Sequence, residues 1–357
     1  MVGTQHNKKI LLIGLGGFGR NHLRAWCEMG MREALYVAEL EPERLEECRI
    51  VGIAETRIAP DYCAFLDQVD VVDIVTPSTS HFELCKEALL RGKDVFVEKP
   101  MTMTSREAQA LADIVSETGP ILQVGYYYRH HPVSQNLKHM IRAGTLGALR
   151  YLSGHFMGFK RARTDVGVTH TDGIHFLDLF NSLVGSPPER VYAETRDHFK
   201  RGMEDWSIVL FNYPDGTVAK VESGYIQPGR WHDKVVPNAM TTKEIFVCGS
   251  EATIEVDFET ENFVMHRVRH EFQQTTWVPV RDLSQTINVG TASPLQMICA
   301  ELREFLSCTD TRKRPNCDVI ASGVVLAKLM EAIYESAKHG VPIPLQWTPA
   351  ETTSFRG

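Results

Sequence analysis

The sequence predicts an α/β protein of two domains, in which a doubly wound parallel sheet precedes an α+β domain with a mostly antiparallel sheet. Its 357 residues fit about two domains of roughly 150 residues each. The first third alternates short apolar runs with polar segments of helical length, which is typical of a parallel sheet covered on both faces. Further along, segments that alternate apolar and polar residues indicate a different, mainly antiparallel sheet. We expect a first domain over residues 1–127 and a second over 128–357.

The strands of the first domain are expected where apolar runs end in turn residues. These runs cover 9–13, 35–38, 70–75, 94–98 and 121–125, and 70–75 reads as a fully apolar strand. The helices between them are expected at 18–30, 42–49, 81–91 and 105–118. Because crossovers between parallel strands are right-handed, this alternation predicts the doubly wound arrangement.

The second domain is expected to mix strands with fewer helices. Strands are predicted at 149–156, 190–195, 206–213, 218–223 and 253–256, with turns such as Pro214-Asp215-Gly216 between them. Helices are predicted at 133–143, 171–183, 294–307 and 319–338. The boundary between the domains is expected between Gly125 and Pro132.

Composition and charge exclude several classes of function. Lys and Arg number 38 against 45 Asp and Glu, so the formal net charge is −7. A mildly acidic chain lacks the basic surface that nucleic acids and anionic membranes attract, and no apolar run reaches the roughly 18 residues of a membrane span. The eight cysteines form no CxxC pair and no zinc spacing, so we expect reduced thiols and no metal. Without a signal-peptide pattern, the sequence predicts a soluble cytoplasmic protein.

A glycine-rich turn follows the first expected strand. Gly14, Gly16 and Gly19 match G-x-G-x-x-G and open a helix, which is the context that dinucleotide binding requires. Gly14 permits the tight turn, Gly16 lets a pyrophosphate approach the backbone, and Gly19 allows close packing of helix on strand. With Gly17 and Phe18 they form the predicted phosphate cradle at a helix N-terminus. The alternative is a strand–helix turn that binds nothing.

The choice of cofactor is predicted from an acidic residue at the end of the second strand. Glu39 stands about 20 residues after Gly19, where a carboxylate can accept both ribose hydroxyls and repels a 2′-phosphate. Glu41 adds negative charge nearby. We therefore expect NAD rather than NADP, the alternative being an ordinary acid at a strand end before Pro42.

Glu98, Lys99 and Pro100 follow the strand at 94–98, at the edge of a parallel sheet where ligands bind. A lysine there can hold a substrate hydroxyl or share its proton. With this segment, the chain resembles the glucose–fructose oxidoreductase/inositol dehydrogenase (Gfo/Idh/MocA) family over essentially its whole length. The segments that carry the resemblance are Gly14–His22, Val75–His81, Gly92–Pro100, Gly125–Pro132, Asp172–Leu179 and Val324–Pro344.

The resemblance implies a Rossmann domain followed by a domain with a large open-faced sheet, and hydride transfer between a nicotinamide and a hydroxyl-bearing carbon. Lys99 matches the lysine that binds the reacting hydroxyl, and Glu98 matches a residue near the nicotinamide ribose. Thr76, Pro77 and His81 match the loop that lies along the cofactor. The substrate would be a sugar, a nucleotide sugar or another sugar derivative, or a cyclitol such as inositol.

His175 matches the family's acid/base histidine, and imidazole titrates near neutral pH. The family usually has Asp or Asn four residues before this histidine, where this chain has Thr171. The acid comes one residue later, at Asp172, and Asp178 is a further candidate partner for His175. Which of the three residues partners His175 stays open. His175 could also be a packing histidine.

Further residues near this helix are candidates for binding substrate. Arg129 matches the arginine of the segment that leads into the second domain. The basic loop Lys160-Arg161-Ala162-Arg163 either clamps a phosphate or carboxylate through Arg163 or is a solvated loop. Aromatic and imidazole rings are candidates to stack on or hydrogen-bond a sugar, although such clusters are more often core; these are Tyr126, Tyr127, Tyr128, Trp231 and His170.

The expected function is therefore an NAD-dependent dehydrogenase in which His175, together with Lys99, acts on the substrate oxygen and Asp172 supports the histidine. Two rival functions remain, namely an enzyme that uses NAD transiently to cleave a glycosidic bond, and a regulatory protein that senses dinucleotide and sugar. Relatives in the family are often dimers or tetramers, so a homodimer or homotetramer is expected by analogy.

Overall fold

The chain divides into two compact units in a computed structural model that describes residues 8–236, 238–282 and 284–355. The first unit joins Met1–His130 to Pro294–Ala327, and the second joins His131–Ser293 to Lys328–Gly357. The first boundary falls inside the expected interval of 125–132. The division differs from the predicted one because residues 294–327, expected in the second domain, belong to the first unit.

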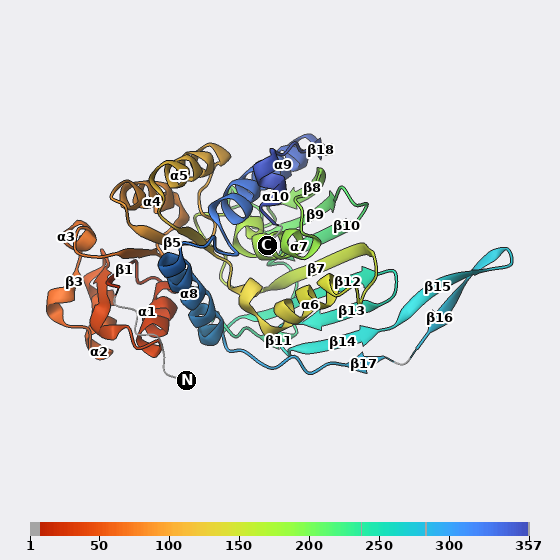
Figure 1. The fold of residues 1–357 in the computed structure, drawn as a ribbon, viewed down its shortest axis with the longest axis horizontal. Coiled ribbons are helices and arrows are strands. Elements are labelled where there is room, and N and C mark those ends of the chain that lie inside the picture. The colour runs from red at the N-terminus through yellow and green to blue at the C-terminus, as the bar shows by residue number, and fades with distance from the viewer. Residues whose placement is uncertain (1–7, 237, 283, 356–357) are drawn as a thin grey trace. The chain divides into compact units, whose positions relative to one another are not determined.

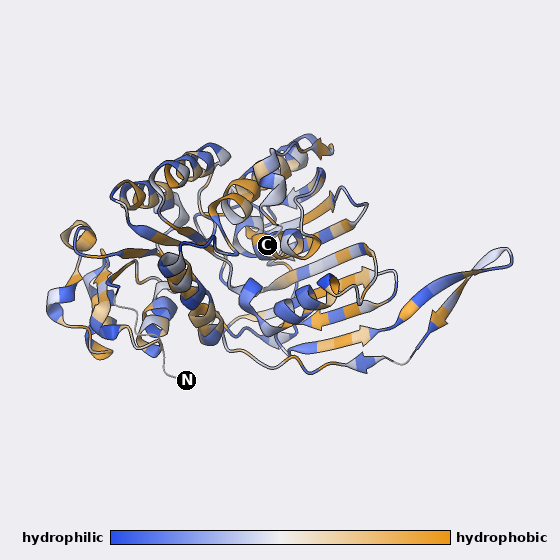
Figure 2. Ribbon diagram, in the orientation of Figure 1, coloured by the Kyte–Doolittle hydropathy of each residue, from blue (hydrophilic) through white to orange (hydrophobic). Residues whose placement is uncertain are grey.

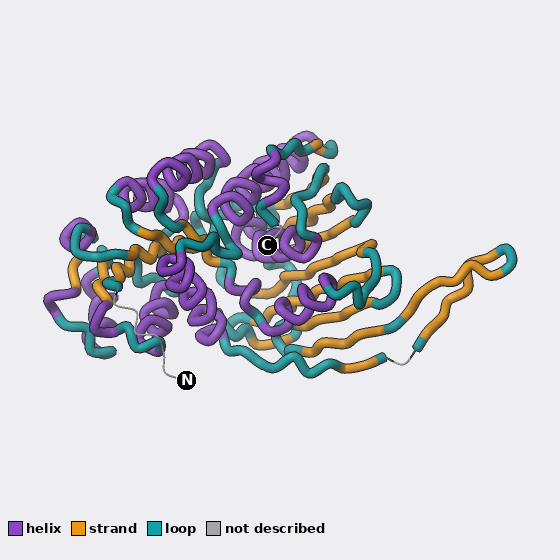
Figure 3. Tube along the Cα trace, viewed as in Figure 1, coloured by secondary structure: helices purple, strands orange, loops and turns teal. Residues whose placement is uncertain are grey.

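A parallel sheet forms the centre of the first unit (Figures 1 and 3), in the order β3-β2-β1-β4-β5-β6. Its strands are β1 (Ile10–Ile13), β2 (Leu35–Ala38), β3 (Ile58–Ala59), β4 (Val71–Ile74), β5 (Asp94–Glu98) and β6 (Leu122–Gly125). The strand order reverses between β1 and β4, which is the point where such sheets bind ligands. This confirms the predicted doubly wound sheet, and it adds the short strand β3, which the sequence did not reveal.

Helices follow the strands of the first unit in alternation. They are α1 (Gly19–Glu28), α2 (Pro42–Ile50), α3 (Cys63–Leu66), α4 (His81–Leu90) and α5 (Ser105–Thr118). Helix α8 (Pro294–Thr311) comes much later in the chain and also belongs to this unit. Helix α5 begins at a capping box in which Thr104 and Glu107 satisfy each other's backbone amides, and it ends at Gly119 with φ of 84°. Short turns of helix cover Arg32–Ala34, Glu55–Arg57, Ser78–Ser80, Tyr127–His130 and Val319–Val324.

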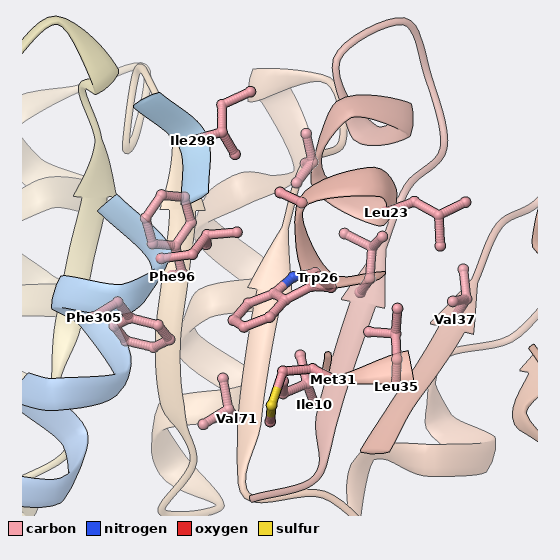
Figure 4. Packing of buried hydrophobic residues seen from close by; sticks show 14 of the residues in the cluster. Ile10, Leu23, Trp26, Met31, Leu35, Val37, Val71, Phe96, Ile298 and Phe305 are labelled. Atoms are coloured by element: carbon pink, nitrogen blue, oxygen red, sulfur yellow. The ribbon is translucent and has the colours of Figure 1, made fainter. Parts of the chain in front are cut away.

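Helix α8 belongs to the first unit because its apolar face completes that unit's core. Figure 4 shows Ile298 and Phe305 of α8 pointing toward Trp26 and Phe96. The rings of Phe96 and Phe305 meet edge to face, with centroids 5.7 Å apart. All four side chains are at most 1% exposed. Burial of this kind stabilises a helix by about 25 cal/mol per Å² of apolar surface, so the returning helix is an integral part of the fold.

A mixed sheet forms the centre of the second unit, in the order β17-β14-β13-β12-β7-β10-β9-β8-β18, with β11 beside β12. The strands are β7 (Leu149–Phe159), β8 (Arg190–Arg196), β9 (Trp206–Asn212), β10 (Val218–Gly224), β11 (Trp231–His232), β12 (Met240–Gly249), β13 (Thr253–Asp257), β14 (Asn262–His266), β17 (Gln285–Thr286) and β18 (Ile343–Pro344). Strands β7 and β10 pair in parallel and the other pairs are antiparallel. Figure 2 shows hydrophobic and hydrophilic residues alternating along these strands, as expected for a sheet with unlike faces.

Helix α7 (Ile174–Val184) packs directly against this sheet. A Cβ at Gly154 of β7 would lie 2.7 Å from the ring of Phe176 and 3.1 Å from that of Phe180, so glycine permits the close approach. The other helices are α6 (Pro132–Arg142), α9 (Val325–His339) and α10 (Pro349–Thr353). None of the described helices has both the length and the apolar character that a membrane crossing needs.

A two-stranded ribbon, β15 (Val268–Gln273) and β16 (Thr276–Arg281), extends from the second unit (Figure 1). Phe272 and Trp277 face each other across it, with ring centroids 5.4 Å apart, and both are more than half exposed. The sequence did not predict this ribbon, since its polar and apolar residues give no clear period.

Candidate active site

The glycine turn of the first unit has the geometry that a phosphate cradle needs. Gly14 adopts φ of 97°, and a Cβ there would lie 2.8 Å from the carbonyl oxygen of Val75. A Cβ at Gly19 would collide with the carbonyl of Gly14. At Gly16 and Gly17, by contrast, a Cβ would meet no described atom within 4 Å. The tight positions are thus the first and last glycines, and the open ones lie where a pyrophosphate approaches.

Glu39 lies beside this turn at the carboxyl end of β2. Its Oε2 accepts a hydrogen bond of 2.5 Å from the amide of Leu15, and its Oε1 accepts one of 2.9 Å from the amide of Glu41. Arg44 lies 3.7 Å from Glu39 and 2.8 Å from Glu41. The carboxylate that was predicted to read the ribose is therefore held in place next to the cradle, and it is 7% exposed.

His81 ties together two loops that carry predicted cofactor residues. Its Nδ1 lies 2.8 Å from the carbonyl oxygen of Pro100, and its Nε2 lies 2.9 Å from that of Thr76. Pro77 adjoins Thr76, and Lys99 precedes Pro100. The structure therefore gives His81 a role in positioning the loops, which the resemblance alone did not distinguish from contact with the cofactor.

Glu98 turns toward a buried cluster at the end of β5. Its Oε2 accepts a hydrogen bond of 3.2 Å from the amide of Lys99, and its Oε1 lies 3.4 Å from His22 Nε2. His22 Nδ1 and Trp26 Nε1 reach the same oxygen of Asp73, at 2.9 Å and 2.7 Å. The segment 70–75 is therefore not a fully apolar strand, because Asp73 is completely buried in it and its Oδ2 accepts from these two donors.

The charge state of this cluster follows from its contacts. Burial alone would lower the pKa of His22, but the carboxylates of Asp73 and Glu98 outweigh it and raise the pKa to about 10. His22 is therefore a buried cation between two acids. Sequence reasoning missed both His22 and Asp73, although a lone acid within an apolar strand was a signal that could have found the pair.

Tyr128 and Arg129 follow β6 and are buried in the first unit. The ring of Tyr127 lies between Tyr128, at 4.6 Å, and Phe18 of the glycine turn, at 6.0 Å. The guanidinium of Arg129 donates to the carbonyl of Asn316 and to the hydroxyl of Ser322, at 2.8 Å and 3.0 Å. Arg129, predicted to bind substrate, thus holds the returning segment of its own unit.

The predicted acid/base residues of the second unit lie where β7 ends and α7 begins. A π-helical turn, Thr169–Gly173, precedes α7 and buries Asp172. Asp172 Oδ1 accepts a hydrogen bond of 2.6 Å from Lys160 Nζ, and the two side chains are 4% and 6% exposed. The hydroxyl of Thr171 donates to the carbonyl of Gly167 at 2.9 Å. The partner that the structure gives Asp172 is therefore a lysine of the basic loop.

His175 is 5% exposed, and its ring lies parallel to that of Phe156 with centroids 6.2 Å apart. Lys160 Nζ lies 4.8 Å from the centroid of the same Phe156 ring, so Lys160 and His175 both flank this ring. The basic loop is thus not uniformly solvated, because Lys160 is buried at its start while Arg161 is exposed. The sequence did not single out Lys160.

Arg163 and His170 have partners within the second unit. Arg163 Nε donates to Asp165 at 2.8 Å, and this hydrogen bond raises the pKa of the guanidinium. His170 Nδ1 lies 2.8 Å from the hydroxyl of Tyr334, which donates in turn to Glu204 at 2.8 Å. Burial raises the pKa of Tyr334 further above its ordinary value, and Glu204 adds to the shift. The phenol therefore stays protonated and fixes the imidazole.

Comparisons with known proteins agree with this geometry. Residues 8–126 match the family model of the oxidoreductase family with an NAD-binding Rossmann fold, and residues 134–255 match that of the GFO/IDH/MocA C-terminal domain. The chain is 28% identical to the UDP-N-acetylglucosamine 3-dehydrogenase of Acidithiobacillus ferrooxidans, over 90% of this chain and 94% of that protein. It is 26% identical to the scyllo-inositol 2-dehydrogenase (NAD(+)) of Bacillus subtilis, over 98% of this chain and 99% of that protein.

A solved structure shares the fold as well. Levoglucosan dehydrogenase in complex with NADH superposes with a TM-score of 0.82 at 20% identity, covering 96% of this chain and 100% of that one. With both family models matched in order along the chain, and with the glycine cradle, the strand-end glutamate and the Glu98–Lys99–Pro100 segment in place, the chain belongs to the Gfo/Idh/MocA family of oxidoreductases.

Proposed function

We propose that this protein is an NAD-dependent dehydrogenase or reductase that acts on a hydroxyl-bearing carbon of a sugar, a nucleotide sugar or other sugar derivative, or a cyclitol. The observation that carries the proposal is the open cradle at Gly16 and Gly17, with the buried carboxylate of Glu39 beside it. The named substrates of the two relatives, a nucleotide sugar and an inositol, support this range of substrates.

NAD is proposed rather than NADP because of the charge beside the cradle. The carboxylate of Glu39 is held by two backbone amides, so it cannot easily turn away from a 2′-phosphate. A dianionic phosphate next to a fixed carboxylate is repelled, whereas ribose hydroxyls donate hydrogen bonds to it. Arg44, the nearby cation, already pairs with Glu41.

A dinucleotide held at Gly16, Gly17 and Glu39 would supply the hydride acceptor of the proposed reaction. His175 accepts the proton of the substrate hydroxyl, which is a task suited to an imidazole. Lys99 donates a hydrogen bond to the same oxygen and stabilises the charge that develops on it. Asp172 is paired with Lys160, so its proposed support of His175 comes from a carboxylate within a buried ion pair.

The proposal is tested by the near-ultraviolet absorbance of NADH, with purified protein and a panel of sugars, sugar phosphates, nucleotide sugars and inositols. The variants Lys99→Ala and His175→Ala should each lower kcat by about 100-fold or more, the usual contribution of a general acid or base. Their affinity for NAD should change far less. Lys86→Ala and His198→Ala are the matched controls, since Lys86 is well exposed on α4 and His198 is exposed in the second unit.

Full activity in both active-site variants would sink the assignment of these residues. If the wild-type protein binds NAD tightly but forms no NADH with any substrate, the result would favour one of the two rival functions. These are an enzyme that uses NAD transiently to cleave a glycosidic bond, and a regulatory protein that senses dinucleotide and sugar. We also propose a homodimer or homotetramer by analogy with the family, and a monomer by light scattering would refute it.

A further inference from the structure

A second acid, Glu301 of α8, joins the buried cluster around Glu98. One ligand-type atom from each of His22, Glu98 and Glu301 lies within 4.8 Å of those of the other two. Glu301 is 0% exposed, and neither of its carboxyl oxygens has a hydrogen-bond partner among the described residues. A buried carboxyl without partners is costly, so its presence in the core calls for a physical account.

The charges around Glu301 favour a neutral carboxyl. The groups that face it from the surrounding elements are His22 of α1, Asp73 of β4, Glu98 of β5, and Glu304 of α8, which lies 3.3 Å from His130. Burial raises the pKa of Glu301 well above its ordinary value, and Glu98 raises it further, while His22 opposes them. If Glu98 and Glu301 were both ionised, their carboxylates, within 4.8 Å of each other, would repel strongly in this buried site.

A metal ion is the rival occupant, and the geometry of His22 argues against it. His22 Nδ1 faces Asp73 at 2.9 Å and its Nε2 faces Glu98 at 3.4 Å, so both nitrogens point at acceptors. The raised pKa of His22 keeps both ring nitrogens protonated, and an imidazolium has no lone pair for a metal. One proton on the Glu98–Glu301 pair serves the same electrostatic purpose as a cation.

We propose that Glu301 is a positioning residue. As a neutral acid it keeps a proton on the Glu98–Glu301 pair and thereby holds Glu98 where its carboxylate accepts the hydrogen bond from the backbone amide of Lys99. The path from Glu301 to Lys99 is short, because Glu98 accepts a hydrogen bond from the backbone amide of Lys99. If Glu301 ionised, Glu98 would be repelled and the Lys99 loop would lose that contact. This role rests on the proposed function of Lys99, whereas the protonation of Glu301 does not.

The protonation is tested by stability, which needs no substrate. Glu301→Gln keeps the size of the side chain and cannot ionise. Unfolded Glu301 ionises above about pH 4.5 while the folded form stays neutral, so wild-type stability falls as pH rises toward the raised folded pKa. The melting temperature of Glu301→Gln, relative to wild type, should therefore rise between about pH 5 and about pH 8. Glu117→Gln, an exposed change on α5, should show no such trend.

The positioning role is tested by kinetics once a substrate is known. Glu301→Gln keeps an uncharged N–H donor in the cluster with Glu98 and should keep kcat within about threefold, whereas Glu301→Leu has no donor and should lose about tenfold or more. In Glu301→Gln the alkaline fall of kcat should also move to higher pH. The KM for substrate should change little in either variant, because Glu301 acts through Glu98.

Three results would overturn the proposal. A melting-temperature difference that does not depend on pH would show that Glu301 is not held neutral. Stoichiometric divalent metal in the purified protein, lost in Glu301→Gln, would replace the proton by an ion. Equal activity of Glu301→Leu and wild type would remove the positioning role while leaving the proposed function of the enzyme intact.

Discussion

The buried ion pair of Lys160 and Asp172 gives the sharpest test of the second unit. The perturbation is Lys160→Met, which keeps the length of the side chain and removes its charge. At the 2.6 Å separation of Nζ and Oδ1, Coulomb's law gives an attraction of about 6 kcal/mol at an effective dielectric constant of about 20. Desolvation of the two ions offsets much of this attraction, so the intact pair has only a small net effect.

Removal of one partner of the pair should lower the stability much more than the small net effect of the intact pair suggests. With Lys160 gone, the carboxylate of Asp172 stays buried without its cation, and such a change costs about 3–5 kcal/mol. Asp172→Asn leaves an unpaired buried ammonium and should cost a similar amount. The double variant removes both charges of the pair and should cost far less than the sum of the single losses, so we expect a coupling free energy of several kcal/mol.

The assay is urea unfolding of wild type, both single variants and the double variant, followed by tryptophan fluorescence. Four of the five tryptophans lie in the second unit, so the signal reports mainly on it. The matched control is the same cycle on Arg269 and Glu271, which pair at 2.7 Å but are 44% and 42% exposed. That cycle should show little or no coupling, because the pair is exposed to solvent. Additive losses at Lys160 and Asp172 would refute the reasoning.

Two further predictions concern the first unit. In His22→Gln, the loss of stability relative to wild type should be largest below about pH 6.5 and should disappear as pH rises through about 10. The reason is that a raised histidine pKa stabilises the fold only while the ring is protonated. Thermal unfolding across this pH range measures the loss, and a loss that stays constant contradicts the prediction. Glu39→Ala should weaken NAD binding and reduce the preference over NADP, as measured by the two dissociation constants, and an unchanged preference would exclude Glu39 as its source.

Local signals predicted the longer strands and helices of the first unit up to His130, but not the short β3 and α3. Each apolar run there is bounded by glycine, proline or polar residues, and α5 has its own start and stop, at Thr104 and Gly119. The predicted strand ends differ from the observed ones by a residue or so. Strand β12 was missed because it contains Lys243, which is 2% exposed. That lysine is buried only because Asp233 and Glu259 pair with it, and those partners are distant in sequence.

The return of residues 294–327 to the first unit could not be predicted for a related reason. The pattern of α8 shows an apolar face but does not say which core that face completes. The contact that decides it, Phe305 against Phe96, joins residues far apart along the chain. Similarly, Glu301 looks like an ordinary helical glutamate until its neighbours are known.

The need of a buried carboxylate for a partner explains the site residues that sequence reasoning missed. Glu98 and Asp172 were both predicted in the active site, and both are nearly fully buried. A buried carboxylate requires a cation or a proton, so each predicted acid implies a partner that must exist somewhere in the fold. The structure supplies His22 for Glu98 and Lys160 for Asp172.

Both partners stood in segments already noted in the sequence, His22 directly after the glycine turn and Lys160 at the start of the basic loop. Thr171, at the position where the resemblance led us to expect Asp or Asn, has an acid beside it in the sequence. That acid, Asp172, pairs with Lys160, the lysine that follows β7. The proposed proton transfer at His175 should therefore respond to the charge of Lys160 as well as to that of Asp172.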